Sequence, residues 1–261
     1  MRIALGLEFC GIAYTGWQSQ RDGRGVQDAL ERALAAIADA EVGTIAAGRT
    51  DTGVHASMQV VHFDTAAARP ATAWVRGVNS HLPSDIAVLW AQPVADDFHA
   101  RYAALARCYT YLLHNRPQRP ALHAGRVGWY HHPLDVAAMI EAAGALTGTH
   151  DFSAFRAAEC QARSPSRTLT TMAIAAGGEH IRFDFCANAF LHHMIRNIVG
   201  ALVYVGAGRH PPAWIAELLA GRDRTRAAPT FAPDGLYFTC ADYDVKWGLP
   251  PSRRPVALPS A

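Results

Sequence analysis

The spacing of apolar residues changes along the first hundred positions of the chain. Residues 2–9 carry apolar side chains at every second position, which predicts a half-buried strand. Residues 25–38 carry them at three- and four-residue intervals, which predicts an amphipathic helix. Further strands are predicted at 43–47, 57–65 and 85–94, and a helix with Pro70 near its start at 68–82. The resulting order, β-α-β-β-α-β, is the ferredoxin-like pattern.

The rest of the chain repeats this order of elements without repeating the sequence. The predicted elements are a strand at 106–115, a helix ending in glycine at 135–148, a hairpin of 167–176 and 180–187 joined through Gly177-Gly178, a strong helix at 191–205, a shorter helix after Pro211-Pro212 and a strand at 235–243. We therefore expect an α+β fold of two ferredoxin-like halves, with mainly antiparallel sheets that meet at a central catalytic cleft. The expected ranges are 1–100 and 101–245, followed by a loose proline-rich tail at 246–261.

Composition narrows the class of protein. Of the 261 residues, 50% are hydrophobic and 18% are charged, as in globular domains, and the net charge of +2 favours no partner. The apolar run at 189–208 contains two histidines, an arginine and an asparagine, so we do not expect it to span a membrane. The five cysteines are scattered and lack any C-x-x-C pair. This pattern argues against a disulfide framework or a thiolate zinc site and predicts a cytoplasmic protein.

The stretch AAGRTDTGVHA places one acid, Asp51, in a turn flanked by Gly48 and Gly53. Glycines allow a backbone to approach a substrate closely. An Asx-type turn, in which the carboxylate bonds its own backbone, is the alternative interpretation of so short a pattern. The density of polar groups favours a functional site, because Arg49 and His55 lie within four residues of Asp51.

Arg196, on the helix predicted at 191–205, is the candidate partner of Asp51. Apolar residues fill most of this helix, and the remaining arc carries His192, His193, Arg196 and Asn197. A buried arginine needs a carboxylate, and a carboxylate in an apolar site needs a cation to stay ionised. A solvated helix face is the alternative interpretation of the arc.

Aromatic and polar residues elsewhere fit a nucleic-acid partner. Tyr109 and Tyr111 alternate on one predicted strand and so share a face, where a tyrosine either packs in the core or stacks on a base. Arginines and glutamines interleave with aromatics in short stretches, a pattern that suits looped or single-stranded RNA. The candidate RNA-binding residues are Trp17, Gln18, Gln20, Arg101 and Arg167.

Several motifs together resemble the bacterial tRNA pseudouridine synthases that act on the anticodon stem-loop at positions 38 to 40. AGRTDTGVHA and HHMIRNIVG are specific to that family, and YTGWQSQ and APDGLYF support them. The resemblance runs from about residue 2 to about residue 245 and keeps the order of the motifs. It implies an enzyme that isomerises uridine to pseudouridine, uses no cofactor or metal, and binds tRNA across both subunits of a homodimer.

Matching the motifs residue by residue implies a catalytic role for Asp51, a pocket role for Tyr109 and an ion-pair role for Arg196. The arginine used in RNA binding and base flipping falls on Arg49, and His55 of the same motif is a further candidate for binding substrate. Asp51 has three possible roles that stay open: attack on ribose C1′, attack on uracil C6, or removal of a ribose proton. Departures from the family's usual residues are Thr52, Cys108, Thr110 and Ser19, and the last three stand where basic residues are common.

Three other functions fit parts of the pattern. D-T-G is also the aspartic-protease signature, but the chain has one copy and alternates helices with strands. A metalloenzyme would use His55, His62, His192 and His193, but no H-x-x-x-H spacing accompanies them. A non-catalytic RNA-binding module would give no reason for Asp51, Tyr109 and Arg196 to occur together.

Overall fold

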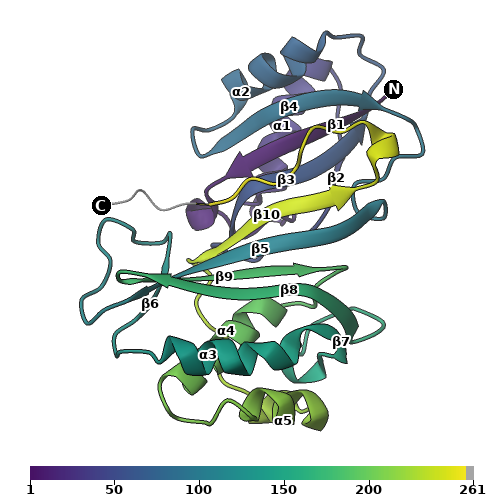
Figure 1. Cartoon of the computed structure of the whole chain (residues 1–261). Helices are drawn as coiled ribbons and strands as arrows, with labels where there is room; N and C mark the ends of the chain where they lie inside the picture. Colours follow the sequence, from purple (N-terminus) through teal and green to yellow (C-terminus); the bar gives the residue numbers. More distant parts are fainter. Residues whose placement is uncertain (257–261) are drawn as a thin grey trace. The chain divides into compact units, whose positions relative to one another are not determined.

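The computed structural model describes residues 1–256, and these form two compact units (Figure 1). Unit 1 contains residues 1–107 and the C-terminal segment from Tyr237 onward, and unit 2 contains residues 108–236. Both units combine helices with strands that pair mostly in antiparallel fashion, so the protein is of the α+β class. None of the described helices combines the length and the apolar character that a membrane-spanning helix needs.

Unit 1 is built on strands in the order β4-β1-β3-β10, and β2 pairs with β3. Its elements are β1 (Arg2–Phe9), η1 (Gly11–Ala13), α1 (Val26–Ala38), β2 (Thr44–Ala46), β3 (His55–Asp64), the π-helical turn η2 (Ala73–Gly77), α2 (Val78–His81), β4 (Ile86–Val94) and β10 (Leu236–Tyr243). The elements predicted for the first hundred residues are confirmed in kind and order, with bounds that differ by a few residues.

Strand β1 is buried on both faces, although its alternating pattern predicts burial on one. Ile3, Leu5 and Leu7 are fully buried, as expected. On the other face, the side chain of Trp90 from the neighbouring strand β4 lies over Gly6, since a Cβ placed on Gly6 would lie 2.1 Å from Nε1 of Trp90. Because Gly6 has no side chain, the indole of Trp90 fills the space above it. The prediction of a half-buried strand is therefore wrong.

Strand β10 belongs to unit 1, whereas its place in the sequence put it with the second half. It pairs in parallel with β3, with Tyr237 opposite His55 and Phe238 opposite Ala56. Phe238 is fully buried. A parallel pair needs a long crossover connection, and the apolar spacing within a strand carries no information about such a partner.

Residues 244–256, which follow β10, are fastened to unit 1 and are not loose, contrary to the prediction. After the short turn η6 (Val245–Trp247), the N–H of Arg254 donates to the carbonyl of Thr239 at 3.1 Å. The Arg254 guanidinium also pairs with Glu8 at 2.7 Å. Residues 257–261 of the predicted tail lie outside the described residues.

Unit 2 is built on strands in the order β5-β9-β8-β7, and β6 pairs in parallel with β5. Its elements are β5 (Ala104–Asn115, which starts in unit 1), β6 (Gly128–Tyr130), α3 (Val136–Ala143), η3 (Gly144–Leu146), β7 (Gly148–Asp151), η4 (Ser153–Phe155), β8 (Ser166–Gly177), β9 (His180–Ala187), α4 (Met194–Gly206), α5 (Trp214–Gly221) and η5 (Arg224–Arg226). Helices α3, α4 and α5 lie together on one side of β8 and β9 (Figure 1). The predicted hairpin is confirmed, and Gly178 in its turn has a φ of 57°.

Two details of α4 differ from the prediction. The helix starts at Met194 because His193 before it has a left-handed φ of 60°. Asn197, expected on the polar arc, is fully buried. Its Nδ2 donates to the carbonyl of Phe155 at 2.8 Å, and its Oδ1 accepts from the hydroxyl of Thr230 at 2.7 Å. Buried polar groups are tolerated when they are hydrogen-bonded, so Asn197 belongs to the core of unit 2.

Cys108 on β5 and Cys186 on β9 form a disulfide, with their Cα atoms 4.2 Å apart. The inference from the scattered cysteines is therefore wrong for this pair. The two residues are 78 positions apart in the sequence. Only the adjacency of β5 and β9 brings them together.

Candidate active site

Asp51 lies in the turn between β2 and β3 of unit 1, and hydrogen bonds hold the backbone of this turn. The N–H of Val54 donates to the carbonyl of Asp51 at 3.1 Å, and the side-chain amide of Gln59 donates to the carbonyl of Gly48 at 2.7 Å. Gly53 has a φ of 80°, a conformation that favours glycine. The turn thus presents the half-buried carboxylate of Asp51 from a defined backbone.

The loop of the YTGWQSQ motif packs directly against this turn. The N–H of Trp17 donates to the carbonyl of Thr50 at 3.0 Å. A Cβ placed on Gly16 would lie 2.6 Å from the oxygen of Thr50, and one placed on Gly11 would lie 2.1 Å from the oxygen of Val54. Two motifs that are distant in the sequence therefore form one closely packed backbone assembly around Asp51.

Two side chains of the same motif as Asp51 differ in exposure: Arg49 is accessible, and His55 is buried. Arg49 is exposed, so its guanidinium is open to a phosphate. His55 is 2% exposed, accepts the N–H of Gly11 at Nδ1 (3.1 Å), and stacks on Tyr237 with ring centroids 4.6 Å apart. These contacts make His55 a residue that positions the neighbouring loop.

The three expected RNA-binding residues of the YTGWQSQ loop differ in exposure and in hydrogen bonding. Trp17 is 2% exposed and packs against Phe9, with ring centroids 6.0 Å apart, so its ring offers no face to a base. The side-chain amide of Gln18 donates to Gln27 at 2.8 Å. That of Gln20 donates to a carbonyl within the loop at 3.0 Å, and Gln20 is exposed. Of these three residues, Gln20 is therefore the most open to a ligand.

Arg101 lies beside an exposed ring in unit 1. Its guanidinium carbon is 5.8 Å from the ring centroid of Tyr102, which is 77% exposed. The ring of His99 stacks on the same tyrosine at 4.2 Å. An exposed aromatic ring next to a cation suits the stacking of an unpaired base. Sequence reasoning did not single out Tyr102, because the exposure of a loop tyrosine depends on tertiary packing.

Tyr109 and Tyr111 of β5 have different surroundings in unit 2. Tyr111 is fully buried, and its hydroxyl donates to the carbonyl of Ala232 at 2.9 Å. Burial, together with the charge of Asp234, holds the pKa of Tyr111 well above its usual value. Tyr109 is 9% exposed and meets the edge of Phe190 at 5.1 Å. Tyr109 is therefore the more accessible ring of the pair.

Arg196 extends from α4 and is half-buried. Its Nε donates to the carbonyl of Phe231 at 2.8 Å, and the N–H of Phe231 donates to the carbonyl of Arg196 at 3.2 Å. These reciprocal bonds fasten the guanidinium and the helix to the segment that precedes β10. The first bond uses Nε of the guanidinium, and the second is made by the backbone alone.

Arg167 lies near the start of β8, and its side chain is hydrogen-bonded to the backbone of the preceding residues. Its Nη1 donates to the carbonyls of Ser164 (2.9 Å) and Ser166 (2.6 Å). Burial lowers the pKa of Arg167; the charge of Cys160 opposes this effect, and that of Arg156 adds to it.

Comparison with known proteins agrees with these features. A family model described as tRNA pseudouridine synthase matches residues 7–103 and 142–244. The tRNA pseudouridine synthase A of Thiobacillus denitrificans is 60% identical over 252 residues, covering 97% of each chain. That of Dechloromonas aromatica is 60% identical over 250 residues, covering 96% of this chain and 95% of the relative. Such coverage defines the class of protein as an RNA-modifying isomerase.

The chain belongs to the tRNA pseudouridine synthase family, and the resemblance inferred from its motifs is confirmed. Among solved structures, 90% of the chain aligns with a chain in a crystal structure of a Cbf5-Nop10-Gar1 complex. The TM-score of 0.36 and the identity of 11% are too low to carry any inference, and the alignment covers 48% of that chain.

Proposed function

We propose that this protein isomerises uridine to pseudouridine in tRNA, at positions 38 to 40 of the anticodon stem-loop. Its membership of the family and its relatives named tRNA pseudouridine synthase A support the proposal. The reaction breaks the C1′–N1 bond, rotates the uracil and forms a C5–C1′ bond. The C5 proton leaves and N1 gains a proton, so the product is an isomer and no redox partner is required. We place the enzyme in the cytoplasm as a homodimer.

Asp51 is the proposed catalytic carboxylate. The observation that carries this assignment is its half-buried position in a turn whose backbone is bonded to β3 and to the YTGWQSQ loop. Attack on ribose C1′, attack on uracil C6 and removal of a ribose proton all require the ionised form. On the sequence alone, Arg196 is the cation proposed to keep Asp51 ionised.

Tyr109 and Arg49 are proposed to handle the flipped nucleotide. A uridine in a stem-loop must leave its stack to react, which costs a few kcal/mol. The exposed guanidinium of Arg49 offsets part of this cost by holding the displaced backbone. Stacking on Tyr109 offsets another part, and its hydroxyl is the proposed carrier of the C5 proton.

The surrounding RNA contacts and the fold of each half complete the proposal. Gln20, Arg101 and Arg167 are proposed to contact the RNA strand, and the exposure of Gln20 and Arg101 supports this. Each half is proposed to be ferredoxin-like. In unit 1, the strand order β4-β1-β3 with β2 on the far side of β3 supports that description.

Release of tritium from tRNA labelled at uridine C5 tests the proposal. Asp51→Asn should bind tRNA and release no tritium, because the amide neither attacks nor accepts a proton. Asp39→Asn is the matched control, since Asp39 is an exposed acid at the end of α1 in a left-handed conformation that asparagine tolerates. Undiminished release by Asp51→Asn would exclude the assigned role. Binding without release by the unaltered protein would favour the non-catalytic RNA-binding module.

A further inference from the structure

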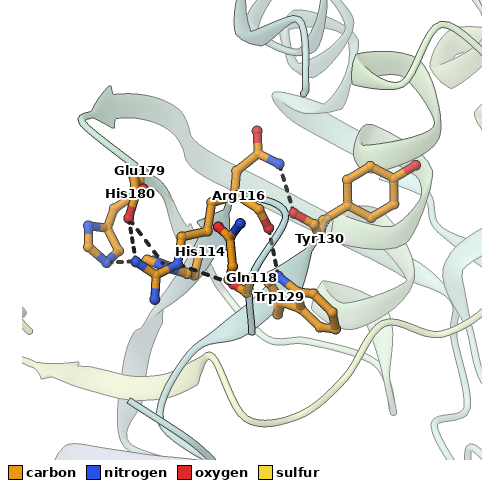
Figure 2. Close-up of polar contacts among 8 residues, drawn as sticks. His114, Arg116, Gln118, Trp129, Tyr130, Glu179 and His180 are labelled. Carbon is orange, nitrogen blue, oxygen red and sulfur yellow. Dashed lines mark hydrogen bonds and ion pairs between the residues drawn. The ribbon is translucent and has the colours of Figure 1, made fainter. Parts of the chain in front are cut away.

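The segment that joins β5 to α3, residues 116–132, is held in place at both ends. We call it the 116–132 loop. The side-chain amide of Asn115 donates to the carbonyls of Tyr130 (2.9 Å) and His132 (2.6 Å). Arg116 pairs with Glu179 of the β8–β9 turn at 2.9 Å, as Figure 2 shows. The loop lies in the part of the chain, 104–141, that the family model leaves unmatched.

Trp129 stands on this loop as a fixed and accessible ring. Its Nε1 donates to the carbonyl of Arg116 at 2.8 Å (Figure 2), and the side chain is nevertheless 40% exposed. The hydrogen bond fixes the indole, so little side-chain freedom is lost when a ligand packs on it. The ring of His131 lies 5.8 Å away. A fixed, exposed aromatic ring is a platform on which an unpaired base stacks.

The charge of the 116–132 loop has one sign. Between Arg116 and Leu134 the sequence contains no aspartate or glutamate, and its basic residues are Arg116, Arg119, His123, Arg126, His131 and His132. Arg116 pairs with Glu179, and the side chains of Arg119 and Arg126 are exposed. Glu179 of the β8–β9 turn is the acid that contacts this loop, and a loop with no acid of its own and with exposed arginines attracts a polyanion and suits phosphate groups in particular.

His114 and His180, next to the loop, support it through a hydrogen bond and do not add to its positive charge. Nδ1 of His114 lies 3.0 Å from Nε2 of His180, so one ring donates to the other. Burial lowers the pKa of both rings, and the charge of Arg116 adds to the effect. A neutral pair supports the loop through hydrogen bonding, which leaves the exposed arginines as the cations at neutral pH.

We propose that the 116–132 loop is a second RNA-binding surface, on which Trp129 stacks an unpaired base while Arg119 pairs with an adjacent phosphate. The inference rests on the proposed function, since the RNA is taken to be a part of the tRNA outside the modified stem-loop. A second copy of the chain is the competing occupant. It is disfavoured because a two-fold contact centred on this loop would place its cationic residues against those of the other copy.

The test compares the affinity of full-length tRNA with that of an isolated anticodon stem-loop. Trp129→Leu should weaken binding of tRNA about tenfold, the effect of losing one stacked base, and should leave stem-loop binding unchanged. Arg119→Gln should weaken binding of tRNA and lower the slope of log affinity against log salt by about one. Arg209→Gln is the matched control, because Arg209 is an exposed arginine over a different ring, Tyr204.

The outcomes separate this proposal from the proposed function. Unchanged tRNA affinity in both Trp129→Leu and Arg119→Gln overturns the second surface, whatever the catalytic result. A shift of either variant from dimer to monomer in light scattering also overturns it, in favour of a contact between copies. Arg119→Gln keeps the test valid if Trp129→Leu folds poorly. The proposed function is tested separately, by measuring whether the unaltered protein releases tritium from labelled tRNA.

Discussion

The backbone N–H of Trp17 donates to the carbonyl of Thr50, the residue before Asp51, at 3.0 Å. The approach depends on Gly16, which has a φ of 101° and leaves no space for a Cβ, since such an atom would lie 2.6 Å from the Thr50 oxygen. The position of the proposed catalytic carboxylate therefore depends on a glycine that lies outside its own motif.

Gly16→Ala should destabilise the protein and reduce turnover. The methyl group meets backbone, and alanine is strained at this φ, so we expect a loss of about 1–3 kcal/mol in the free energy of unfolding. Denaturant titration and tritium release measure the two effects. Gly43→Ala is the control, because nothing lies within 4 Å of a Cβ placed there. Equal behaviour of the two variants would contradict the role assigned to Gly16.

Tyr109→Phe and Tyr111→Phe should have opposite effects. The buried hydroxyl of Tyr111 donates to Ala232, so its removal should cost about 1–2 kcal/mol of stability and spare turnover. Tyr109→Phe should retain tRNA affinity but slow tritium release, since it keeps the ring and removes the proposed proton carrier. Thermal denaturation and single-turnover kinetics distinguish the two. A wild-type rate for Tyr109→Phe would remove the hydroxyl from the mechanism.

His62 should make unit 1 sensitive to acid. Its ring is 3% exposed and accepts the N–H of Ala100 at Nδ1 (3.1 Å). Burial lowers its pKa to about 4, and the nearby charges of Arg2 and His99 act in the same direction, against an opposing effect of Asp64. The unfolded chain takes up this proton first, near the ordinary histidine pKa of about 6.5. Stability is therefore fully present above pH 6.5 and falls as the pH drops toward 4.

The loss of stability caused by His62 should be large enough to measure as a change in unfolding free energy with pH. At about 1.4 kcal/mol per pKa unit, the loss between pH 6.5 and 4 has an upper limit of about 3 kcal/mol. His62→Asn keeps an acceptor for Ala100 and should flatten the curve of unfolding free energy against pH in this window. His81→Asn, a change at an exposed histidine, should not. An unchanged slope in His62→Asn would show that other groups control the acid sensitivity.

The Cys108–Cys186 disulfide should be detectable by counting thiols. Without reductant, the denatured protein should react with alkylating agent at Cys10, Cys160 and Cys240, and after reduction at all five cysteines. The loop that the bridge closes is long, so reduction should lower the stability by about 2–4 kcal/mol. Mass spectrometry gives the count and thermal denaturation the stability. Five reactive thiols before reduction would refute the bridge, and Cys10→Ser should leave the loss on reduction unchanged.

Local patterns predicted the elements well because their cause is local. The three- and four-residue spacing of α1 is confirmed, since it reflects one buried face of a regular element. The glycines of the β8–β9 turn are confirmed for the same reason, because the left-handed φ of Gly178 is a property of the residue itself.

The surroundings of the candidate site residues followed from the sequence only in part. The turn that carries Asp51 follows from the polar and glycine positions of one short stretch. The burial of Trp17 did not follow, because an aromatic residue in a polar loop has the same sequence signature whether it packs inward or faces a ligand. Tyr102 illustrates the converse, since its 77% exposure depends on how its loop crosses the surface of unit 1.

The order and kind of the helices and strands, and the family to which the chain belongs, were readable from the residues alone, because both depend on neighbours a few positions apart or on short motifs. The parallel pairing of β10 with β3, the contact of Trp90 with Gly6 and the Cys108–Cys186 bridge were decided by tertiary structure. Each joins residues that are far apart in the sequence. The free energy of such contacts arises only after the chain has folded, so no local spacing records it.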